Sequence, residues 1–170
     1  MFTYKIVLLG DFGTGKSSLI KRYIDNNFNE EYLSTIGVSI LNKVIDTYVN
    51  NKTYTSNTMI WDIEGKTDFK PILSHYLNGA KGFIIVADLT RKNTINFISE
   101  HLTLCEETMP NLPICIALNK SDLEYEEIDL KSLKKLFPNI VFITKTSAKD
   151  NSNIEELFDV LSKKIVEQLL

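Results

Sequence analysis

Gly10-Asp11-Phe12-Gly13-Thr14-Gly15-Lys16-Ser17 is the stretch that decides the fold. It matches the pattern G-x-x-x-x-G-K-[ST], and it lies between an apolar run at residues 6–9 and helical spacing over residues 16–25. Backbone N–H groups approach phosphates closely only where glycine removes the side chain, and a helix start adds its positive dipole end. Lys16 supplies a charge for the β and γ phosphates and Ser17 a hydroxyl for Mg²⁺. We therefore predict a phosphate site made by Gly13, Thr14, Gly15, Lys16, Ser17 and Ser18.

Short apolar runs alternate along the chain with longer segments of helical spacing. The runs at residues 83–87, 114–118 and 140–143 are too short for buried helices, and they are typical of strands covered on both faces of a parallel sheet. Helices are predicted over about residues 94–107 and 153–169. In the second helix the apolar residues recur at the spacing of an amphipathic helix: Ile154, Leu157, Phe158, Leu161 and Ile165.

Residues 38–63 break this alternation, because two long strand-like runs flank Asn50-Asn51-Lys52 with no room for a helix. A hairpin there places one antiparallel strand at the edge of an otherwise parallel sheet. The predicted fold is α/β: a six-stranded, mostly parallel sheet with one antiparallel edge strand and helices on both faces, in a single domain over residues 1–170. Ligands bind such sheets beyond the carboxyl ends of the strands.

Asn119-Lys120-Ser121-Asp122 follows directly after the apolar run that ends near residue 118. A carboxylate at Asp122 can accept hydrogen bonds from the ring N–H and the exocyclic amine of guanine, whereas adenine presents neither donor there and leaves the charge unpaired. The stretch therefore predicts a guanine site. The alternative is a plain Asn-Lys turn with a solvated aspartate.

Two more strand ends carry polar residues. Thr146-Ser147-Ala148-Lys149 follows residues 140–143, where a second loop is expected to meet the base, although such a turn is commonly a helix cap. In Ile60-Trp61-Asp62-Ile63-Glu64-Gly65, the carboxylate of Asp62 is a candidate Mg²⁺ ligand, directly or through water, and Gly65 lets a backbone N–H reach a γ-phosphate. Without the phosphate loop this stretch reads equally well as a strand that ends in a turn.

With these motifs the chain resembles a Ras-superfamily small GTPase of the P-loop NTPase fold, and within that group most closely the Rab branch. The resemblance extends over essentially all 170 residues and includes Tyr32-Leu33-Ser34-Thr35-Ile36-Gly37-Val38 and the pair Gly79-Ala80 before Gly82. It implies that GTP and GDP are the ligands and that they bind together with Mg²⁺. The metal ion would be held by Ser17, Thr35 and Asp62. It further implies that Phe28 and Lys120 pack on the two faces of the guanine, and that the base is contacted by Asn119, Asp122, Ser147, Ala148 and Lys149. From the residues alone, Phe28 would be interpreted as core packing.

The catalytic positions implied by the resemblance are Lys16, Thr35, Gly65 and Lys66, and here the chain departs from the family. The family has Thr-Ala-Gly-Gln-Glu where this chain has Ile63-Glu64-Gly65-Lys66-Thr67. A glutamine amide both donates and accepts, whereas Lys66 only donates and cannot orient a water molecule in the same way. Glu64 either faces solvent or brings negative charge near the γ-phosphate. Phe12 stands at a position that usually holds a small residue. Its ring either covers the γ-phosphate, where it could obstruct an incoming arginine, or turns outward or packs under a switch loop.

Composition limits the class of protein and its location. A net charge of −3 argues against a general nucleic-acid binder. Cys105 and Cys115 lie in apolar patterns and are expected to be buried thiols, and the chain shows neither a signal peptide nor an apolar stretch of membrane-spanning length. Glu167-Gln168-Leu169-Leu170 holds no cysteine for prenylation and Phe2 excludes N-myristoylation, so the sequence shows no lipid anchor. We expect a cytoplasmic protein, peripheral to membranes if a tail is missing.

Two functions from different classes are therefore compared. In the leading hypothesis the chain is a slow GTPase (GTP phosphohydrolase) and molecular switch, whose loops around Thr35 and Gly65 are ordered by GTP and contacted by effector, exchange and activating proteins. The alternative is a pseudo-GTPase scaffold that binds guanine nucleotide with negligible hydrolysis, which Lys66 and Phe12 favour. A P-loop kinase is disfavoured, because residues 119–122 indicate guanine and no arginine-rich lid insertion is visible.

Overall fold

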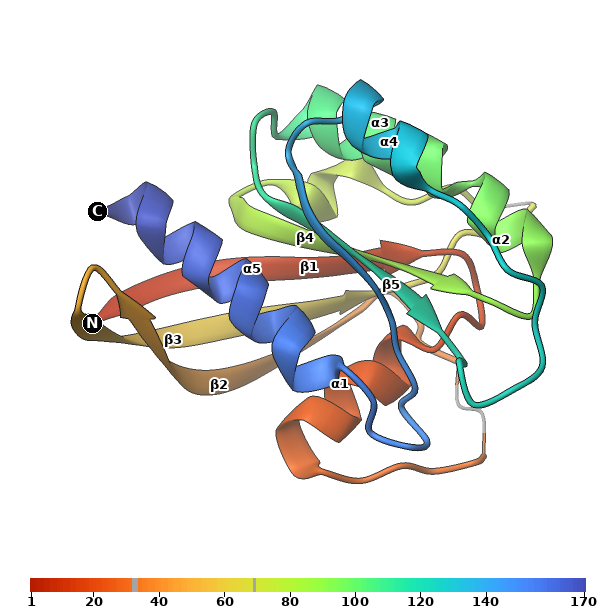
Figure 1. Ribbon diagram of the computed structural model, residues 1–170, viewed down its shortest axis with the longest axis horizontal. Helices are drawn as coiled ribbons and strands as arrows, with labels where there is room; N and C mark the ends of the chain where they lie inside the picture. The colour runs from red at the N-terminus through yellow and green to blue at the C-terminus, as the bar shows by residue number, and fades with distance from the viewer. Residues whose placement is uncertain (32–33, 69) are drawn as a thin grey trace.

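The computed structural model describes residues 1–31, 34–68 and 70–170, and these form a six-stranded sheet of order β2-β3-β1-β4-β5-β6. Tyr32 and Leu33, which belong to the stretch that resembles the small GTPases, lie outside the described residues, as does Phe69. The strands are β1 (Phe2–Gly10), β2 (Val38–Val49), β3 (Lys52–Ile63), β4 (Ala80–Asp88), β5 (Ile114–Asn119) and β6 (Ile140–Lys145). The predicted α/β fold with a six-stranded sheet is confirmed (Figure 1).

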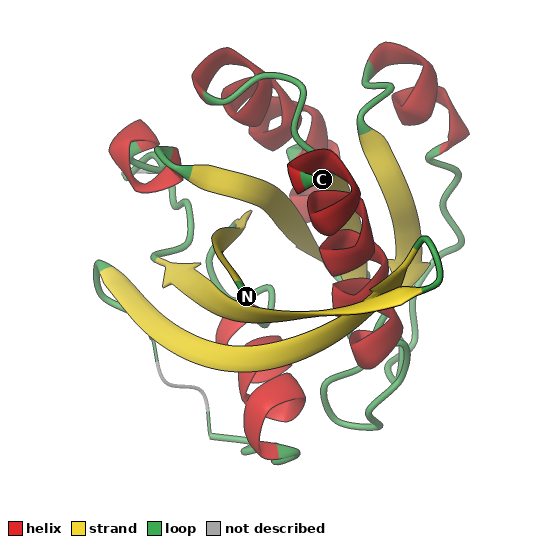
Figure 2. Cartoon of the chain, turned by 90° about the vertical axis from the view of Figure 1, so that its left-hand side faces the viewer, coloured by secondary structure: helices red, strands yellow, loops and turns green. Residues whose placement is uncertain are grey.

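The edge of the sheet is the predicted hairpin. β2 pairs with β3 antiparallel from Val38↔Ile63 to Val49↔Lys52, whereas the other neighbouring strands pair in parallel. Asn50 and Asn51 make the turn with φ angles of 50° and 63°, a conformation that asparagine tolerates better than most residues and that suits a two-residue hairpin. Figure 2 shows the strong twist of this long ribbon.

Helices cover both faces of the sheet (Figure 1). α1 (Lys16–Asp25) and α5 (Ile154–Leu169) share one hydrophobic cluster with side chains such as Ile6 and Ile84, while α2 (Lys92–Asn96) and α3 (Ile98–Thr108) share the other with Val7 and Phe83. Alternate residues of β1 and β4 thus enter opposite cores. The predicted helix over 94–107 is divided at Phe97. The turn η1 (Ser74–Leu77) and α4 (Lys131–Leu136) were not predicted, because such short elements show no clear period.

Both cysteines are buried, as expected. Cys105 on α3 and Cys115 on β5 are free thiols with no exposed surface, and they lie in different hydrophobic clusters. Burial raises the pKa of both thiols well above the ordinary value. Among the described residues, no helix combines the length and the apolar character needed to cross a membrane.

Candidate functional site

The carboxyl ends of β1, β4 and β5 meet at one edge of the sheet, and a pocket of about 420 Å³ opens there. The predicted site residues that line it are Gly13, Gly15, Lys16, Ser17, Ser18, Phe28, Thr35, Gly65, Asn119, Lys120, Asp122, Ala148 and Lys149. Thr14 and Ser147 are fully buried behind this lining, and Asp62 lies against Ser17. The structure therefore brings together residues that are up to 136 positions apart, from Gly13 to Lys149.

The phosphate loop is attached to the end of β5 through Asn119. The Asn119 amide donates to the Thr14 carbonyl at 3.0 Å, and its oxygen accepts from the Thr146 hydroxyl at 3.1 Å. Gly15 has a left-handed φ of 99°, and a Cβ there would lie only 2.2 Å from the Asn119 amide nitrogen. This position therefore admits only glycine, for both backbone and steric reasons. The loop and the Asn119 segment are thus joined by direct hydrogen bonds and close packing.

Lys16 supplies a buried cation at the base of the pocket. Its ammonium is held by the Asp11 carbonyl at 2.9 Å and the Gly10 carbonyl at 3.4 Å, and only 6% of the residue is exposed. Burial lowers its pKa to about 8, although the carboxylates of Asp62 and Asp11 oppose this shift. An anion in the pocket would stabilise the charged form.

Ser17, Thr35 and Asp62 converge at one point beside the pocket. The Ser17 hydroxyl donates to Asp62 Oδ2, and the Thr35 hydroxyl lies 2.7 Å from Ser17 Oγ and 3.4 Å from the same carboxylate oxygen. The other oxygen, Asp62 Oδ1, is buried without a hydrogen-bond partner in the described part of the chain. Burial raises the pKa of Asp62, against the hydrogen bond from Ser17 and the charge of Lys16. Two hydroxyls beside a buried carboxylate with an unpaired oxygen are a donor set that fits Mg²⁺.

At the other end of the pocket, Asp122 is held in place by Ser147. The Ser147 hydroxyl donates to Asp122 Oδ1 at 2.8 Å and accepts from the Asp150 N–H at 2.9 Å. Arg22 on α1 holds the same loop, because its guanidinium donates to the carbonyls of Ala148 at 2.7 Å and Lys149 at 2.8 Å. The carboxylate is therefore fixed in orientation, as a site that selects a base by hydrogen bonding requires.

Lys120 connects the two ends of the pocket. Its ammonium donates to the Gly13 carbonyl at 3.0 Å and lies 2.8 Å from Asp88 Oδ2, a fully buried carboxylate at the end of β4. Phe28 is half-buried and also lines the pocket. Sequence reasoning missed Arg22 and Asp88. Asp88 directly follows the apolar run at residues 83–87, which is a usable signal, whereas nothing near Arg22 in the sequence indicates a contact 126 residues away.

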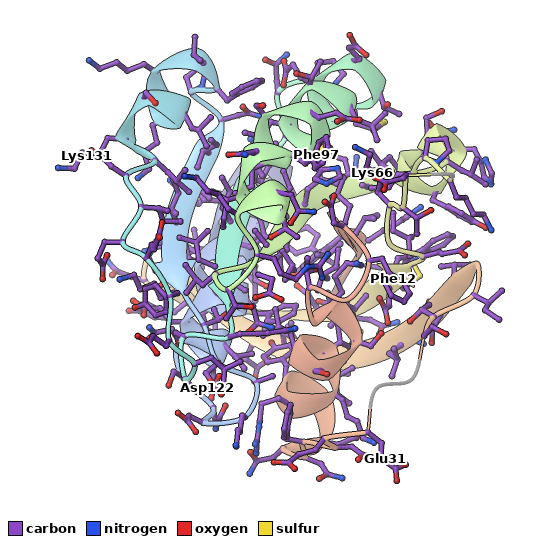
Figure 3. The ribbon with its side chains drawn as sticks, turned by 90° about the vertical axis from the view of Figure 1, so that its right-hand side faces the viewer. Phe12, Glu31, Lys66, Phe97, Asp122 and Lys131 are labelled. Carbon is purple, nitrogen blue, oxygen red and sulfur yellow. The ribbon has the colours of Figure 1, made fainter. Side chains whose placement is uncertain are left out.

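Lys66 joins the phosphate loop through its backbone and α3 through its side chain. Its N–H donates to Gly10 O at 3.0 Å, and its carbonyl accepts from the Phe12 N–H at 2.8 Å. Its ammonium lies 2.9 Å from Glu100 and 3.4 Å from the ring centroid of Phe97, and Figure 3 shows Lys66 and Phe97 together, far from Asp122. The side chain does not line the pocket, and its catalytic role stays a prediction.

Glu64 takes a position that differs from both sequence-based alternatives. Its carboxylate accepts from the Gly37 N–H at 3.3 Å and pairs with Lys70 at 2.8 Å, with 25% of the side chain exposed. Lys70 lowers the pKa of this carboxyl. Glu64 therefore links the segment after Thr35 to the segment after Gly65, which explains why it neither points freely into solvent nor into the pocket.

Gly65 and Phe12 lie against each other at the mouth of the pocket. A Cβ on Gly65 would lie 2.6 Å from Phe12 Cα and 2.9 Å from the Lys16 ammonium, so only glycine fits this close approach. Phe12 lines the pocket and is 42% exposed. Whether the ring covers the γ-phosphate of a bound nucleotide stays a prediction.

Comparison with known proteins gives consistent matches over almost the whole chain. A family model described as Ras family matches residues 5–167. The GTP-binding protein ypt1 of Schizosaccharomyces pombe is 35% identical over 172 residues, which cover 99% of this chain and 82% of that protein. The Ras-related protein RABD2a of Arabidopsis thaliana is 34% identical over 171 residues (99% and 82%), and the Ras-related protein SEC4 of Saccharomyces cerevisiae is 32% identical over 167 residues (97% and 76%).

Proposed function

The chain belongs to the Ras family, and from this premise we propose that its pocket holds GTP or GDP, with the bound nucleotide setting the arrangement of the segments around Thr35 and Gly65. It is a GTP-binding switch GTPase. The observation that carries the proposal is the occurrence, in one pocket, of a phosphate loop at one end and the fixed Asp122–Ser147 pair at the other. Membership of the family favours this function over a scaffold without hydrolysis.

For the base, we propose that Asp122 accepts two hydrogen bonds from guanine, with Phe28 and Lys120 on the two faces of the ring and Ala148 offering its backbone N–H to the base. Asn119, Ser147 and Lys149 position this end of the site. The support is the orientation of Asp122 by Ser147, and of the 147–149 loop by Arg22.

For the phosphates, we propose binding by the N–H groups of residues 13–18 and the ammonium of Lys16, with the N–H of Gly65 reaching the γ-phosphate. Mg²⁺ would be held by Ser17 and, with GTP, Thr35, and Asp62 would hold it directly or through water. The ion would neutralise charge on the β and γ phosphates. The support is the convergence of the three side chains and the unpaired oxygen of Asp62.

For hydrolysis, we propose a slow intrinsic rate, because Lys66 stands at the position of the water-orienting glutamine and its ammonium is held by Glu100. Lys16, Thr35 and Gly65 remain the proposed catalytic positions beside it. Phe12 at the mouth of the pocket would also hinder an arginine supplied by an activating protein.

Three further proposals complete this assignment. Residues 1–170 form one GTPase domain, since a single sheet separates the two hydrophobic clusters. Effector, exchange and activating proteins contact the segments around Thr35 and Gly65, and nucleic acid is not a partner. The location is the cytoplasm, at membranes only as a peripheral protein if the natural chain carries a lipidated tail.

The decisive experiment identifies the nucleotide that co-purifies with the chain and then measures single-turnover hydrolysis of bound GTP. We expect GDP or GTP in the purified protein and slow conversion of GTP to GDP. Adenine nucleotide in the pocket would contradict the base assignment, and retention of GTP without any turnover would favour the scaffold.

A further inference from the structure

Three consecutive carbonyls of the phosphate loop each receive a hydrogen bond from a side chain. Thr14 O accepts from the Asn119 amide and Gly13 O from the Lys120 ammonium, both at 3.0 Å. Phe12 O accepts from the Arg91 guanidinium at 2.8 Å. The first two donors lie at the end of β5 and directly after it, and they belong to the base end of the site. Arg91 comes from a separate loop, after β4, and nothing in the proposed function uses it.

Arg91 is held by an ordered turn. Its N–H donates to the Asp88 carbonyl at 3.0 Å, and its carbonyl accepts from the Thr94 hydroxyl at 2.8 Å. The Asp88 carboxylate accepts from the Thr90 hydroxyl at 2.7 Å and lies 2.8 Å from the Lys120 ammonium. The buried carboxylate of Asp88 thus positions both the loop that carries Arg91 and the ammonium of Lys120, which holds the Gly13 carbonyl.

The C=O and N–H of a trans peptide point in opposite directions. A carbonyl held from outside the loop therefore leaves the N–H of the same peptide directed to the inner side, where phosphates bind. The peptide that joins Phe12 to Gly13 has its carbonyl on Arg91, and Gly13 lines the pocket. A hydrogen bond from a cation also polarises the peptide and strengthens its N–H as a donor.

We propose that Arg91 is a positioning residue of the phosphate site, which holds the Phe12 carbonyl and so directs and strengthens the Gly13 N–H toward the phosphates of the bound nucleotide. Gly13 has the φ angle of 73° that such a loop needs, and a Cβ there would lie 3.2 Å from the Arg91 nitrogen. The residue acts through the loop backbone and not by contact with the base. This inference rests on the proposed guanine-nucleotide function.

The test compares the full chain with Arg91→Ala, Arg91→Lys and Arg91→Gln, with Lys92→Ala as a control that removes an exposed charge from the neighbouring position. Arg91→Ala and Arg91→Gln should each weaken GDP about tenfold, because a charge-assisted hydrogen bond is lost. Arg91→Lys should restore most of the affinity, and Lys92→Ala should leave it unchanged. Guanosine, which has no phosphate, should bind all variants equally.

The ³¹P NMR spectrum of bound GDP gives a second readout, which mere loosening of the fold would not move in the same way. We expect a changed phosphate resonance in Arg91→Gln and a spectrum close to the unmodified protein in Arg91→Lys. Unchanged GDP affinity and an unchanged spectrum in Arg91→Gln would overturn the proposal, as would equal losses of GDP and guanosine. Failure of the unmodified chain to bind GDP would instead refute the proposed function.

Discussion

The Lys66 ammonium lies 2.9 Å from a carboxylate oxygen of Glu100, and this ion pair carries the side chain across the ring of Phe97 onto α3. Only 17% of the Lys66 side chain is exposed, so the contact is partly shielded from water. The backbone of Lys66 is paired with the phosphate loop at the same time. Both the backbone and the side chain of Lys66 are therefore held, in an arrangement that keeps the ammonium away from the pocket.

Lys66→Gln should raise the rate of intrinsic hydrolysis. In the unmodified chain we expect a single-turnover rate on the order of 10⁻⁴ s⁻¹ or below, because an ammonium only donates hydrogen bonds and cannot orient water as a glutamine amide does. Lys66→Gln combined with Phe12→Gly should be faster still if the phenyl ring obstructs the γ-phosphate. Glu100→Gln breaks the ion pair and leaves Lys66 itself unchanged. It therefore tests the opposite possibility, that a free Lys66 ammonium assists hydrolysis. If the ammonium stabilised developing phosphate charge, the unmodified chain would be fast and Lys66→Gln would be slow.

Asp122→Asn should exchange guanine for xanthine selectivity. The carboxylate pairs with two donors of guanine, whereas an amide can donate to the additional carbonyl of xanthine. We expect the unmodified chain to prefer GTP over ATP by ~10⁴ or more in competition experiments, because adenine leaves the carboxylate unpaired. Ser147→Ala is the matched control, since it removes the support of Asp122 but keeps the charge: it should weaken GTP modestly without favouring xanthine. Equal affinity for GTP and ATP in the unmodified chain would refute the assignment.

Ser17→Asn should weaken GTP more than GDP. The hydroxyl of Ser17 lies at the proposed Mg²⁺ site with Thr35 and Asp62, and a Mg²⁺ ion held there would neutralise charge that GTP carries in excess of GDP. EDTA should accelerate nucleotide release from the unmodified chain and have a smaller effect on Ser17→Asn. Ser18→Ala changes the adjacent hydroxyl and serves as the comparison. Nucleotide release that is indifferent to EDTA would exclude the metal.

The affinity for GDP should fall as the pH rises above about 8. Burial lowers the pKa of Lys16 to about 8 in the free protein, and phosphate in the pocket raises it again because it favours the ammonium. Below this pH Lys16 is already charged when GDP binds. Above this pH the binding of GDP takes up a proton, and the affinity declines as the pH rises. Calorimetry in two buffers of different ionisation enthalpy measures this uptake. Guanosine should show none, and uptake that stays constant from pH 7 to 9 would contradict the prediction.

The arrangement of the elements was predictable because it depends on local patterns. The apolar runs located β4, β5 and β6, and the absence of helical spacing over residues 38–63 located the hairpin. Phe97 shows the limit of such patterns: its neighbours have continuous helical spacing, yet the helix divides there, and the α4 segment is too short and too polar to show a period.

The residues that line the pocket were predictable where a strand end or a motif marked them, as at Lys16, Asn119 and Asp122. The residues that hold them in place were not. Arg22 and Arg91 donate to backbone carbonyls that are distant in sequence. Every residue has a backbone carbonyl, so no pattern of residue types reveals which one accepts the hydrogen bond. Glu64 was misplaced for the same reason, since its main partner in the segment after Thr35 is a backbone N–H.

The two buried cysteines make the chain convenient for site-specific labelling. Cys105 and Cys115 are inaccessible and their thiols stay protonated at neutral pH, so a maleimide dye would react with neither while the protein is folded. A single cysteine introduced at exposed Ile36 would then carry the fluorophore without prior removal of the native thiols. On the unmodified chain, the rate at which the same reagent labels the buried thiols would report how often the core opens. Each thiol belongs to one of the two hydrophobic clusters, so the two sides of the sheet would be measured separately.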